Sequence, residues 1–375
     1  GTWEGVAEDF APWNVNVTTI DPGTEALRRV GSGDTQWGAR VVITDDTFAN
    51  CSCGGHAYIG AFDDSADEPT FVYNSSLAGV KEASSHEVGH MMNLAHDGTR
   101  TDAYYTGHGS GATSWAPIMG ASYYVAVSQW SQQEYRDANN TGSRANYNNG
   151  ADDLAIISSM SNGNGFGLKG DDHGNDAAAA TLLEAPSPSA SGIIGTRSDV
   201  DTFSFSSGGG TLSFVASPAP SSPNLDIALT LRNSNGQVIA SSNPAGALDA
   251  ALTVTVGAGK YTLTVDGVGV GSPTSNPPTG YSDYGSIGQY SIVGTVPTPG
   301  PADTTPPSAP AGLQASASVD AKRVTLTWSS NIEPDLAGYR VLRKTAASSF
   351  ALIGTVTAQA TSFADTTVQP TTTYT

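Results

Sequence analysis

Hydrophobic and polar positions follow two periodicities along this 375-residue chain, helical spacing and strand-like alternation, and the first 169 residues contain both. Apolar side chains recur at helical spacing over residues 2–12, and Ser75 or Ser76 can cap a second helix over 77–92. Between these helices, short apolar or alternating runs favour strands at 13–19, 39–44, 56–62 and 71–74. Strands that alternate with helices predict an α/β (α+β) layer for residues 1–169.

Strict alternation of apolar and polar residues dominates residues 170–298. The Asn235-Gly236 pair lies between two alternating runs and is typical of a tight hairpin turn. The predicted strands are 200–205, 211–216, 225–231, 252–256, 261–265 and 290–293. We expect an all-β jelly roll or sandwich, which the Gly- and Asn-rich linker 161–170 joins to the first segment.

A Pro-rich stretch at residues 299–310 marks a second boundary, because such sequences form extended, semi-stiff spacers. Beyond it, residues 311–375 contain further short strands at the spacing of a β-sandwich. The chain is therefore predicted to be multidomain, with two β-rich parts after a mixed one.

Composition narrows the classes of function. Lys and Arg number 16 against 35 Asp and Glu, a net charge of −19, whereas a nucleic-acid-binding protein needs a basic face. Residues 1–169 carry 8 basic and 20 acidic groups (net −12), residues 170–298 carry 3 and 10 (net −7), and the rest is neutral. No apolar run is long enough to span a membrane. We therefore expect neither nucleic-acid binding nor a membrane span.

One short segment combines residue types that bind and use a metal. His86 and His90 are four apart on the predicted helix, so both imidazoles leave the same face, one turn apart. Two neutral imidazoles there can bind one Zn²⁺, and the adjacent Glu87 can act as general base on a water. His96 lies six residues beyond His90, which requires a sharp turn. Asn93 lies at that turn and tolerates a positive φ better than most residues.

The string HEVGHMMNLAHD resembles the HExxHxxGxxH motif of the metzincin zinc peptidases, and the Asp after the third His is similar to the reprolysin branch. The later sequence PIMG is similar to the Met-turn of that family. The resemblance covers most of residues 1–160 and implies one catalytic Zn²⁺. The implied roles are metal ligands His86, His90 and His96, general base Glu87, and Met119 as the hydrophobic floor beneath the metal. The sequence departs from the family at Asn93, where the motif has Gly, and at Ala121, where some branches have Tyr.

The resemblance also indicates where a substrate would lie. In metzincins the strand at the position of GGHAYIG is the antiparallel sheet edge above the cleft, to which a substrate can add as a further strand. This implies that Gly55, His56 and Ala57 lie beside the substrate backbone, and a tight turn is the other explanation of the glycines. His108 is a candidate for the specificity pocket, with an ordinary loop histidine as the alternative. Tyr123 is a candidate to assist the transition state.

Cysteines and acidic clusters leave alternatives open. Cys51 and Cys53 can form a disulfide or remain free thiols, and secretion favours the disulfide. One acidic cluster spans residues 63–68, and a second lies in DDHGND at the start of the middle segment. The members of the second cluster are Asp171, Asp172 and Asp176. Their oxygen ligands suit Ca²⁺, but neither cluster has EF-hand spacing, so solvated loops are the alternative.

The β-rich parts resemble two known accessory domains. The motifs DDHGND, SDVDTFSF, LDIALTLRNSNGQVI and GKYTLTVDG are similar to a bacterial pre-peptidase C-terminal domain, a type that typically follows secreted peptidases. Residues 311–375 resemble a partial fibronectin type III domain, in which Trp328 and Tyr339 match core positions and Tyr374 the tyrosine corner. From these resemblances we expect the last two strands of that fold and the first strand of the metzincin fold to be missing. We expect a piece of a longer precursor, with a signal peptide and any propeptide upstream.

Together these features predict a secreted, extracellular, monomeric zinc metalloendopeptidase. Its implied partners are protein or peptide substrates, with extracellular matrix or cell-wall polymer bound through the β domains. One alternative is an adhesin-like surface or matrix-binding protein whose metallo-domain is degenerate. Another is zinc-dependent amide hydrolysis of a non-protein substrate.

Overall fold

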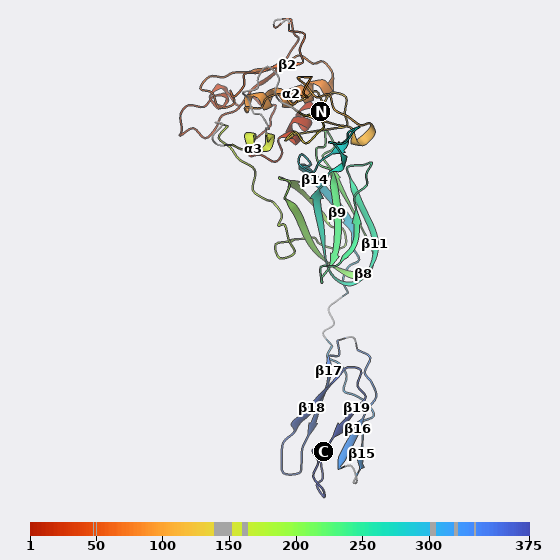
Figure 1. Ribbon diagram of the computed structural model, residues 1–375. Helices are drawn as coiled ribbons and strands as arrows, with labels where there is room; N and C mark the ends of the chain where they lie inside the picture. Colours follow the sequence, from red (N-terminus) through yellow and green to blue (C-terminus); the bar gives the residue numbers. More distant parts are fainter. Residues whose placement is uncertain are drawn as a thin grey trace. The chain divides into compact units, whose positions relative to one another are not determined.

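The computed structural model describes residues 1–47, 49, 51–138, 152–159, 164–300, 305–318, 322–333 and 335–375. These residues form two compact units, Gly1–Pro299 and Gly300–Thr375. In both units β-strands make up most of the regular secondary structure, as Figure 1 shows. Parts of the two predicted linkers, residues 161–163 and 301–304, lie outside the described residues.

The described helices lie in the first 169 residues, together with two small sheets. The helices are α1 (Thr2–Asp9), α2 (Leu77–Met91) and α3 (Asp153–Ile157), with 3-10 turns at Thr24–Leu27 and Gly111–Thr113. The first sheet has the order β1 (Val41–Ile43), β3 (Thr70–Val72), β2 (Gly55–His56). Strand β1 is parallel to β3, whereas β2 is antiparallel to β3 and forms an edge of the sheet. The second sheet is a parallel pair, β4 (Trp115–Pro117) and β5 (Val127–Gln129).

Two strands predicted for this segment do not form. Residues 13–19 make one isolated bridge and no strand. In the stretch 56–62 only the first residue belongs to a strand, because the chain turns at Gly60, whose φ is 75°. The N–H groups of Gly60 and Phe62 donate to the last carbonyls of α2. The last carbonyls of a helix have no partner within the helix itself. This stretch supplies partners for those of α2 instead of extending the sheet.

Residues 170–299 fold around one bent seven-stranded sheet. Its main path is β10–β9–β11–β8–β14–β7, and β6 pairs in parallel with β8. The bounds are β6 (Thr181–Leu182), β7 (Ser189–Ile194), β8 (Val200–Pro218), β9 (Ile227–Asn233), β10 (Val238–Ser242), β11 (Ala250–Gly267) and β14 (Gly288–Thr295). A separate hairpin consists of β12 (Val270–Ser272) and β13 (Thr279–Tyr281). Strands β8 and β11 each unite two predicted strands, because glycines at positive φ such as Gly209 let one strand continue through a bend.

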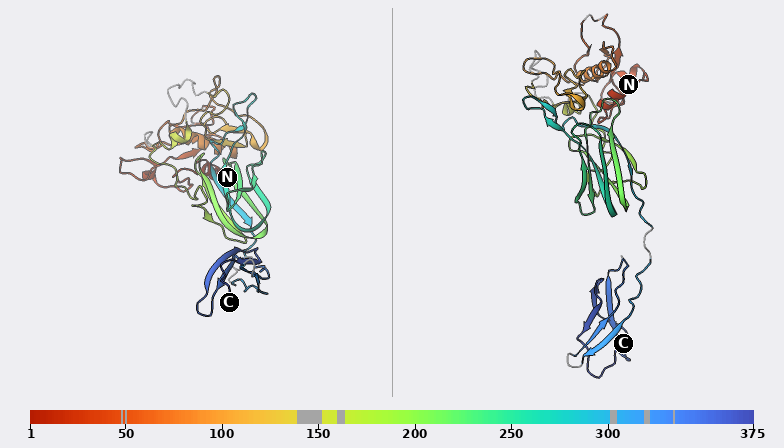
Figure 2. Two further views of the ribbon diagram at one scale, coloured as in Figure 1. Left: turned by 60° about the horizontal axis from the view of Figure 1, so that its bottom comes forward. Right: turned by 90° about the vertical axis from the view of Figure 1, so that its right-hand side faces the viewer.

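The mixed segment and the β-rich segment of the first unit share one hydrophobic core. Figures 1 and 2 both show the mixed segment at one end of the long strands. At the junction, the Glu8 carboxylate accepts hydrogen bonds from the backbone N–H and side-chain amide of Gln289, at 3.1 and 3.0 Å. The neighbouring Asp9 carboxylate accepts one from Asn224 at 3.0 Å. Buried polar bonds therefore join α1 to the β-rich segment.

The second unit has its own small core. Its strands are β15 (Gln314–Ser318), β16 (Arg323–Thr327), β17 (Gly338–Arg343), β18 (Ala351–Thr357) and β19 (Ser362–Asp365), arranged as sheets β15–β16–β19 and β17–β18. The predicted core positions Trp328 and Tyr339 are buried, with ring centroids 5.2 Å apart. The Tyr374 hydroxyl accepts a hydrogen bond from the N–H of Gln369, five residues upstream, at 2.9 Å. This bond has the form of a tyrosine corner.

Candidate metal centre

Helix α2 supplies two of the three histidines. As predicted, a serine caps the helix: the Ser76 side chain accepts a hydrogen bond from the N–H of Gly79. His86 follows about three turns later and His90 one turn after it, in the buried second half of the helix. The local sequence therefore determines both the start of the helix and the shared face of these two imidazoles.

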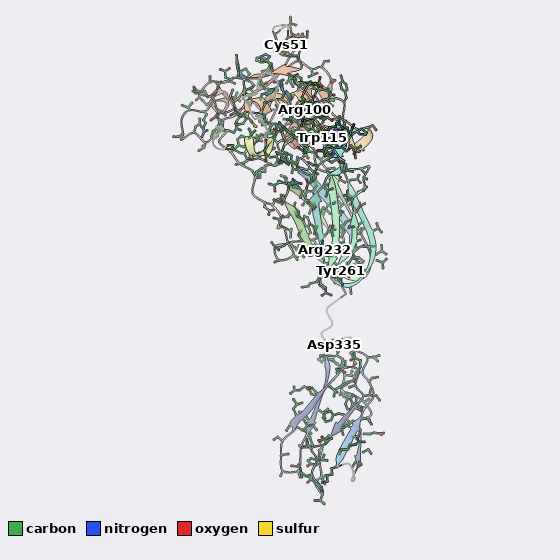
Figure 3. All side chains as sticks on the ribbon, viewed as in Figure 1. Cys51, Arg100, Trp115, Arg232, Tyr261 and Asp335 are labelled. Atoms are coloured by element: carbon green, nitrogen blue, oxygen red, sulfur yellow. A yellow bond between two sulfur atoms is a disulfide. The ribbon has the colours of Figure 1, made fainter. Side chains whose placement is uncertain are left out.

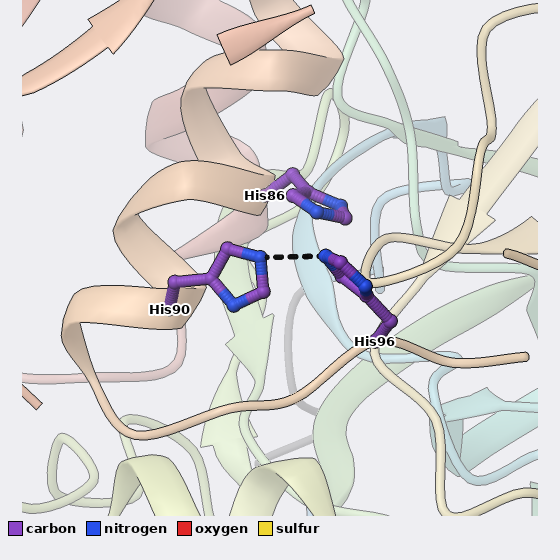
Figure 4. Close-up of side chains that lie close together, drawn as sticks. All are labelled: His86, His90 and His96. Carbon is purple, nitrogen blue, oxygen red and sulfur yellow. Dashed lines mark hydrogen bonds between the residues drawn. The ribbon is translucent and has the colours of Figure 1, made fainter. Parts of the chain in front are cut away.

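The third histidine comes back to this face through a sharp turn. The predicted positive φ is confirmed at Asn93, where φ is 80°. The N–H of Asn93 donates to the carbonyl of His90, and the N–H of Leu94 donates to that of Gly89, so the helix ends in a tight reversal. His96 then lies with its Nε2 atom 3.0 Å from that of His90. Figure 4 shows the three imidazoles facing one another, and their candidate ligand atoms lie within 4.8 Å of one another.

Backbone carbonyls orient two of these rings. The Nδ1 atom of His86 lies 2.8 Å from the carbonyl oxygen of Ile118, and that of His90 lies 2.8 Å from that of Leu94. A neutral ring that donates from Nδ1 keeps a lone pair on Nε2, the form that binds a metal. Burial, with the neighbouring His90 and His96, holds the pKa of His86 well below its ordinary value, so its neutral form is favoured. The residues present thus fit Zn²⁺, whose ligands include imidazole nitrogens.

Glu87 lies beside the histidines without a hydrogen-bond partner for one oxygen. Burial raises the pKa of this carboxyl to about 8, and its Oε2 atom has no hydrogen-bond partner among the described residues. A Cβ added at Gly55 would lie 2.7 Å from Glu87 Oε1, so the backbone of β2 passes directly over this carboxylate. A nearby bound cation would favour the charged form of the carboxyl.

Met119 packs beneath the histidines. Its side chain is fully buried, and a Cβ added at Gly89, between His86 and His90, would lie 2.5 Å from Met119 Sδ. Its carbonyl accepts a hydrogen bond from the N–H of Asp97, next to His96. The predicted Met-turn therefore contacts both the helix and the segment after the third histidine.

The predicted substrate strand lies at the edge of its sheet. Gly55 and His56 form β2, and Ala57 packs partly against the core. The His56 ring is turned towards β3: it stacks on Phe71 at 5.2 Å, and its Nδ1 atom lies 2.8 Å from the Tyr73 hydroxyl. The backbone of β2, more than the His56 side chain, therefore borders the region of Glu87.

Two tyrosines lie near this region, and the sequence pointed to only one of them. Tyr123 is close to β2, since a Cβ added at Gly54 would lie 2.7 Å from its hydroxyl. Burial, with a contribution from the nearby Glu87 charge, raises the pKa of Tyr123. The half-exposed Tyr104 was not predicted, although its ring centroid lies 4.2 Å from that of His96. An aromatic residue between the third histidine and the PIMG sequence is too weak a pattern for the sequence alone to identify Tyr104 as a site residue.

His108 does not join the three histidines. Its Nε2 atom lies 2.6 Å from the carbonyl oxygen of Gly280 in β13, and its Nδ1 atom lies 2.7 Å from the Tyr105 hydroxyl. Both ring nitrogens are thus engaged at the junction with the β-rich segment.

The acidic cluster in the structure does not have the same members as the predicted calcium site. The Asp176 carboxylate accepts hydrogen bonds from the N–H groups of its own turn, at Ala178 and Ala179. Asp171 instead gathers with Asp199 and Asp201, and one oxygen from each lies within 4.8 Å of the others. Sequence reasoning missed the last two because their proximity to Asp171 depends on the fold. The Asp-x-Asp spacing at the start of β8 was the available signal.

This second cluster contains unsatisfied buried oxygens. Asp201 is fully buried and Asp199 is 9% exposed, and the Oδ1 atom of each has no hydrogen-bond partner among the described residues. A hollow of about 220 Å³ borders Asp171, Asp172 and Asp199. Burial raises the pKa of Asp201 to about 7, and the charges of Asp199 and Asp172 add to this effect. In the first acidic stretch, by contrast, Asp63 and Asp67 pair with Arg29 and Arg40.

Cys51 and Cys53 form a disulfide in the loop before β2. Figure 3 labels Cys51. Disulfides are typical of proteins in oxidising compartments. Among the helices of the described residues, none has the length and apolar character needed to cross a bilayer.

Comparisons with known proteins assign no family. No protein-family profile matches the chain, and no curated protein matches it. Similar solved structures include the pre-peptidase C-terminal domain of a Bacillus anthracis collagenase, at 11% identity over 31% of this chain and 94% of that one, with a TM-score of 0.23. Another is PliG of Aeromonas hydrophila, a periplasmic inhibitor of g-type lysozyme, at 12% identity over 31% and 95% of the two chains and a TM-score of 0.23. The FN1–FN3 domains of chicken CNTN1 are 14% identical over 52% and 60%, with a TM-score of 0.17. At such low identities and TM-scores, these likenesses assign neither family nor function.

Proposed function

We propose that this chain is a secreted zinc-dependent endopeptidase of the metzincin type that hydrolyses peptide bonds of extracellular proteins. The observation that carries the proposal is the cluster of His86, His90 and His96 beside the buried carboxylate of Glu87, one oxygen of which has no hydrogen-bond partner among the described residues. An unpaired buried carboxylate lowers the stability of the fold, so its presence calls for an explanation, and a catalytic role supplies one. The disulfide agrees with an extracellular site.

In this proposal the chain's own residues hold the metal, move the proton and align the substrate. When bound by the three histidines, zinc supplies a Lewis acid that polarises the scissile carbonyl. Glu87 accepts a proton from the attacking water and transfers it to the leaving amine nitrogen. The edge strand β2 offers backbone groups that pair with an extended substrate, and this pairing aligns the scissile bond over Glu87.

The test is Glu87→Gln, which keeps the size of the side chain and removes the base. We expect proteolysis of casein or a peptide library to fall by about 10² to 10⁴-fold, the usual contribution of a general base, with zinc content unchanged. Glu25→Gln, at an exposed glutamate of the same segment, is the matched control. Full activity in zinc-loaded Glu87→Gln would refute the mechanism. Polymer binding with no chelator-sensitive cleavage by the wild type would favour the adhesin-like alternative.

We also propose that Asp171, Asp199 and Asp201 hold a calcium ion that stabilises the β-rich segment. Support comes from the Oδ1 atoms of Asp199 and Asp201, which are buried and have no hydrogen-bond partner within the part of the chain that the structure describes. Hard oxygen ligands suit Ca²⁺, and a cation would offset the repulsion between these carboxylates.

Calcium dependence of the melting temperature tests this site. The protein is first freed of metal and then reloaded with zinc alone. Calcium added at 100 times its Kd is then expected to raise the free energy of unfolding by about 3 kcal/mol. The variant Asp201→Asn is expected to lose this gain, whereas Asp176→Asn, at the predicted residue outside the cluster, retains it. An unchanged melting temperature of the wild type in millimolar calcium would contradict the proposal.

A further inference from the structure

The hairpin β12–β13 of the β-rich segment contacts the loop that follows the third histidine. The Gly280 carbonyl in β13 accepts a hydrogen bond from Nε2 of His108 at 2.6 Å. His108 also pairs with Trp115 through both backbone groups, at 2.9 Å each, which closes the loop 108–115. One carbonyl of the β-rich segment therefore fixes the position of a histidine in the mixed segment.

Apolar packing strengthens this contact. Trp115, Val127 and Tyr135 of the mixed segment form a buried cluster with Tyr281 of β13, next to Gly280. Val270 of β12 packs partly against the same cluster. Figure 3 labels Trp115 at this junction. The hairpin thus buries its side chains against the loop as well as bonding to it, so the loop cannot move without exposing apolar surface.

A continuous set of contacts runs from His108 to the three histidines. The Tyr105 hydroxyl donates to Nδ1 of His108 at 2.7 Å, since Nε2 carries the proton that the Gly280 carbonyl accepts. The backbone of Tyr105 donates to the Asp97 carbonyl at 2.7 Å and accepts from the N–H of Ala121 at 2.9 Å. Tyr105 therefore ties the loop both to the residue after His96 and to the end of the Met-turn.

The same loop carries the tyrosine that lies against the candidate metal centre. Tyr104 precedes Tyr105, and its ring centroid lies 4.2 Å from that of His96 and 6.1 Å from that of His86. Its half-exposed ring forms a wall beside the histidines. Through Tyr105, the loop that carries this ring is hydrogen-bonded to His108.

We propose that His108 is a positioning residue through which the hairpin β12–β13 holds the loop 97–121, and with it the Tyr104 ring that flanks the three histidines. The β-rich segment is then part of the catalytic unit and not a detachable accessory. This inference rests on the proposed peptidase function. Its structural content, restraint of the loop by the hairpin, is measurable without activity.

Hydrogen–deuterium exchange of the zinc-loaded full chain measures that restraint directly. His108→Ala is expected to raise exchange in peptides from residues 97–121, whereas His108→Gln, which keeps a donor for the Gly280 carbonyl, is expected to retain most of the protection. Gly280→Ala tests the other partner, because Gly280 has a φ of 62° and an added Cβ would clash with the Val270 carbonyl. Gly236→Ala is the matched control: its φ is 77°, in the β9–β10 turn, with open space around an added Cβ.

Kinetics on a peptide substrate test the functional part. A shift of about 1 Å in a positioned group can cost 10²-fold, so His108→Ala is expected to lower kcat/KM by about 10 to 10²-fold, mainly by raising KM, with zinc content unchanged. His108→Gln is expected to recover most of this loss, and Gly236→Ala to show none. Unchanged exchange at 97–121 in both His108→Ala and Gly280→Ala would overturn the inference. Raised exchange with wild-type KM would also overturn it, whereas wild-type activity in Glu87→Gln would refute only the proposed mechanism.

Discussion

Glu8 and Asp9 are two acids that α1 carries into the interior, where they meet the β-rich segment. Both are almost fully buried, and the pKa of each is raised, chiefly because burial removes the carboxylate from water. Hydrogen bonds from Gln289 and Asn224 offset only part of that cost. Such residues reduce stability when ionised, yet they fix how the two segments pack.

The pKa of Glu8, raised from 4.5 to about 7, predicts a pH-dependent stability. Between these two values the folded protein keeps a proton that the unfolded chain has lost, so the free energy of unfolding falls as pH rises. Glu8→Gln cannot ionise, so its stability relative to the wild type should rise by as much as about 3 kcal/mol from pH 4 to pH 8. Urea unfolding at the two pH values measures this difference. A pH-independent difference in stability between Glu8→Gln and the wild type would contradict the assignment.

Asn93 shows how far residue-level reasoning reaches. The spacing of His90 and His96 demanded a reversal, and the positive φ expected at Asn93 is present. Local geometry was enough to predict this positive φ, because a helix that must end within three residues can adopt few backbone conformations. Tyr104 shows the opposite case: its contact with His96 depends on the path of the whole loop, which no local pattern encodes.

At the scale of elements, the helix was easier to predict than the strands. Helix α2 begins and ends within one residue of its predicted range, because cap, spacing and motif all lie within one stretch of sequence. The stretch 56–62 has strand-like residues, but its N–H groups bind the end of α2. Such a competition between a sheet and a helix end is decided by tertiary structure, so alternation alone could not reveal it.

Strand β8 illustrates a second limit. Its alternating runs were predicted correctly as strands, but the glycines between them carry a single bent strand that pairs with β11 along most of its length. This continuity also brings Asp199 and Asp201, at the start of β8, to Asp171 near the start of the segment. The cluster therefore depends on strand pairing, and the sequence identified only Asp171 of these three acids.

At the scale of the whole molecule, contacts join the mixed and β-rich segments into a single compact unit. They share a hydrophobic core, and buried polar bonds cross their junction at α1 and at His108. The sequence indicated a boundary near residue 169 from its change of periodicity. Composition and periodicity report on secondary structure, however, and not on whether two neighbouring segments bury surface against each other.

Two truncations test where the functional unit ends. A chain that stops after Gly300 keeps every contact described for the first unit, so its melting temperature and its cleavage of a short peptide should match those of the full chain. A chain that stops after Lys169 loses the Gln289 and Asn224 partners of α1 and the hairpin that contacts His108. Glu8 and Asp9 would then lose these hydrogen bonds, and an apolar face would be exposed, so we expect this shorter chain to lose cooperative unfolding or to aggregate. Calorimetry with peptide cleavage measures both properties. A stable, fully active chain of residues 1–169 would show that the junction is dispensable, and the β-rich segment would then be an accessory to a self-sufficient peptidase.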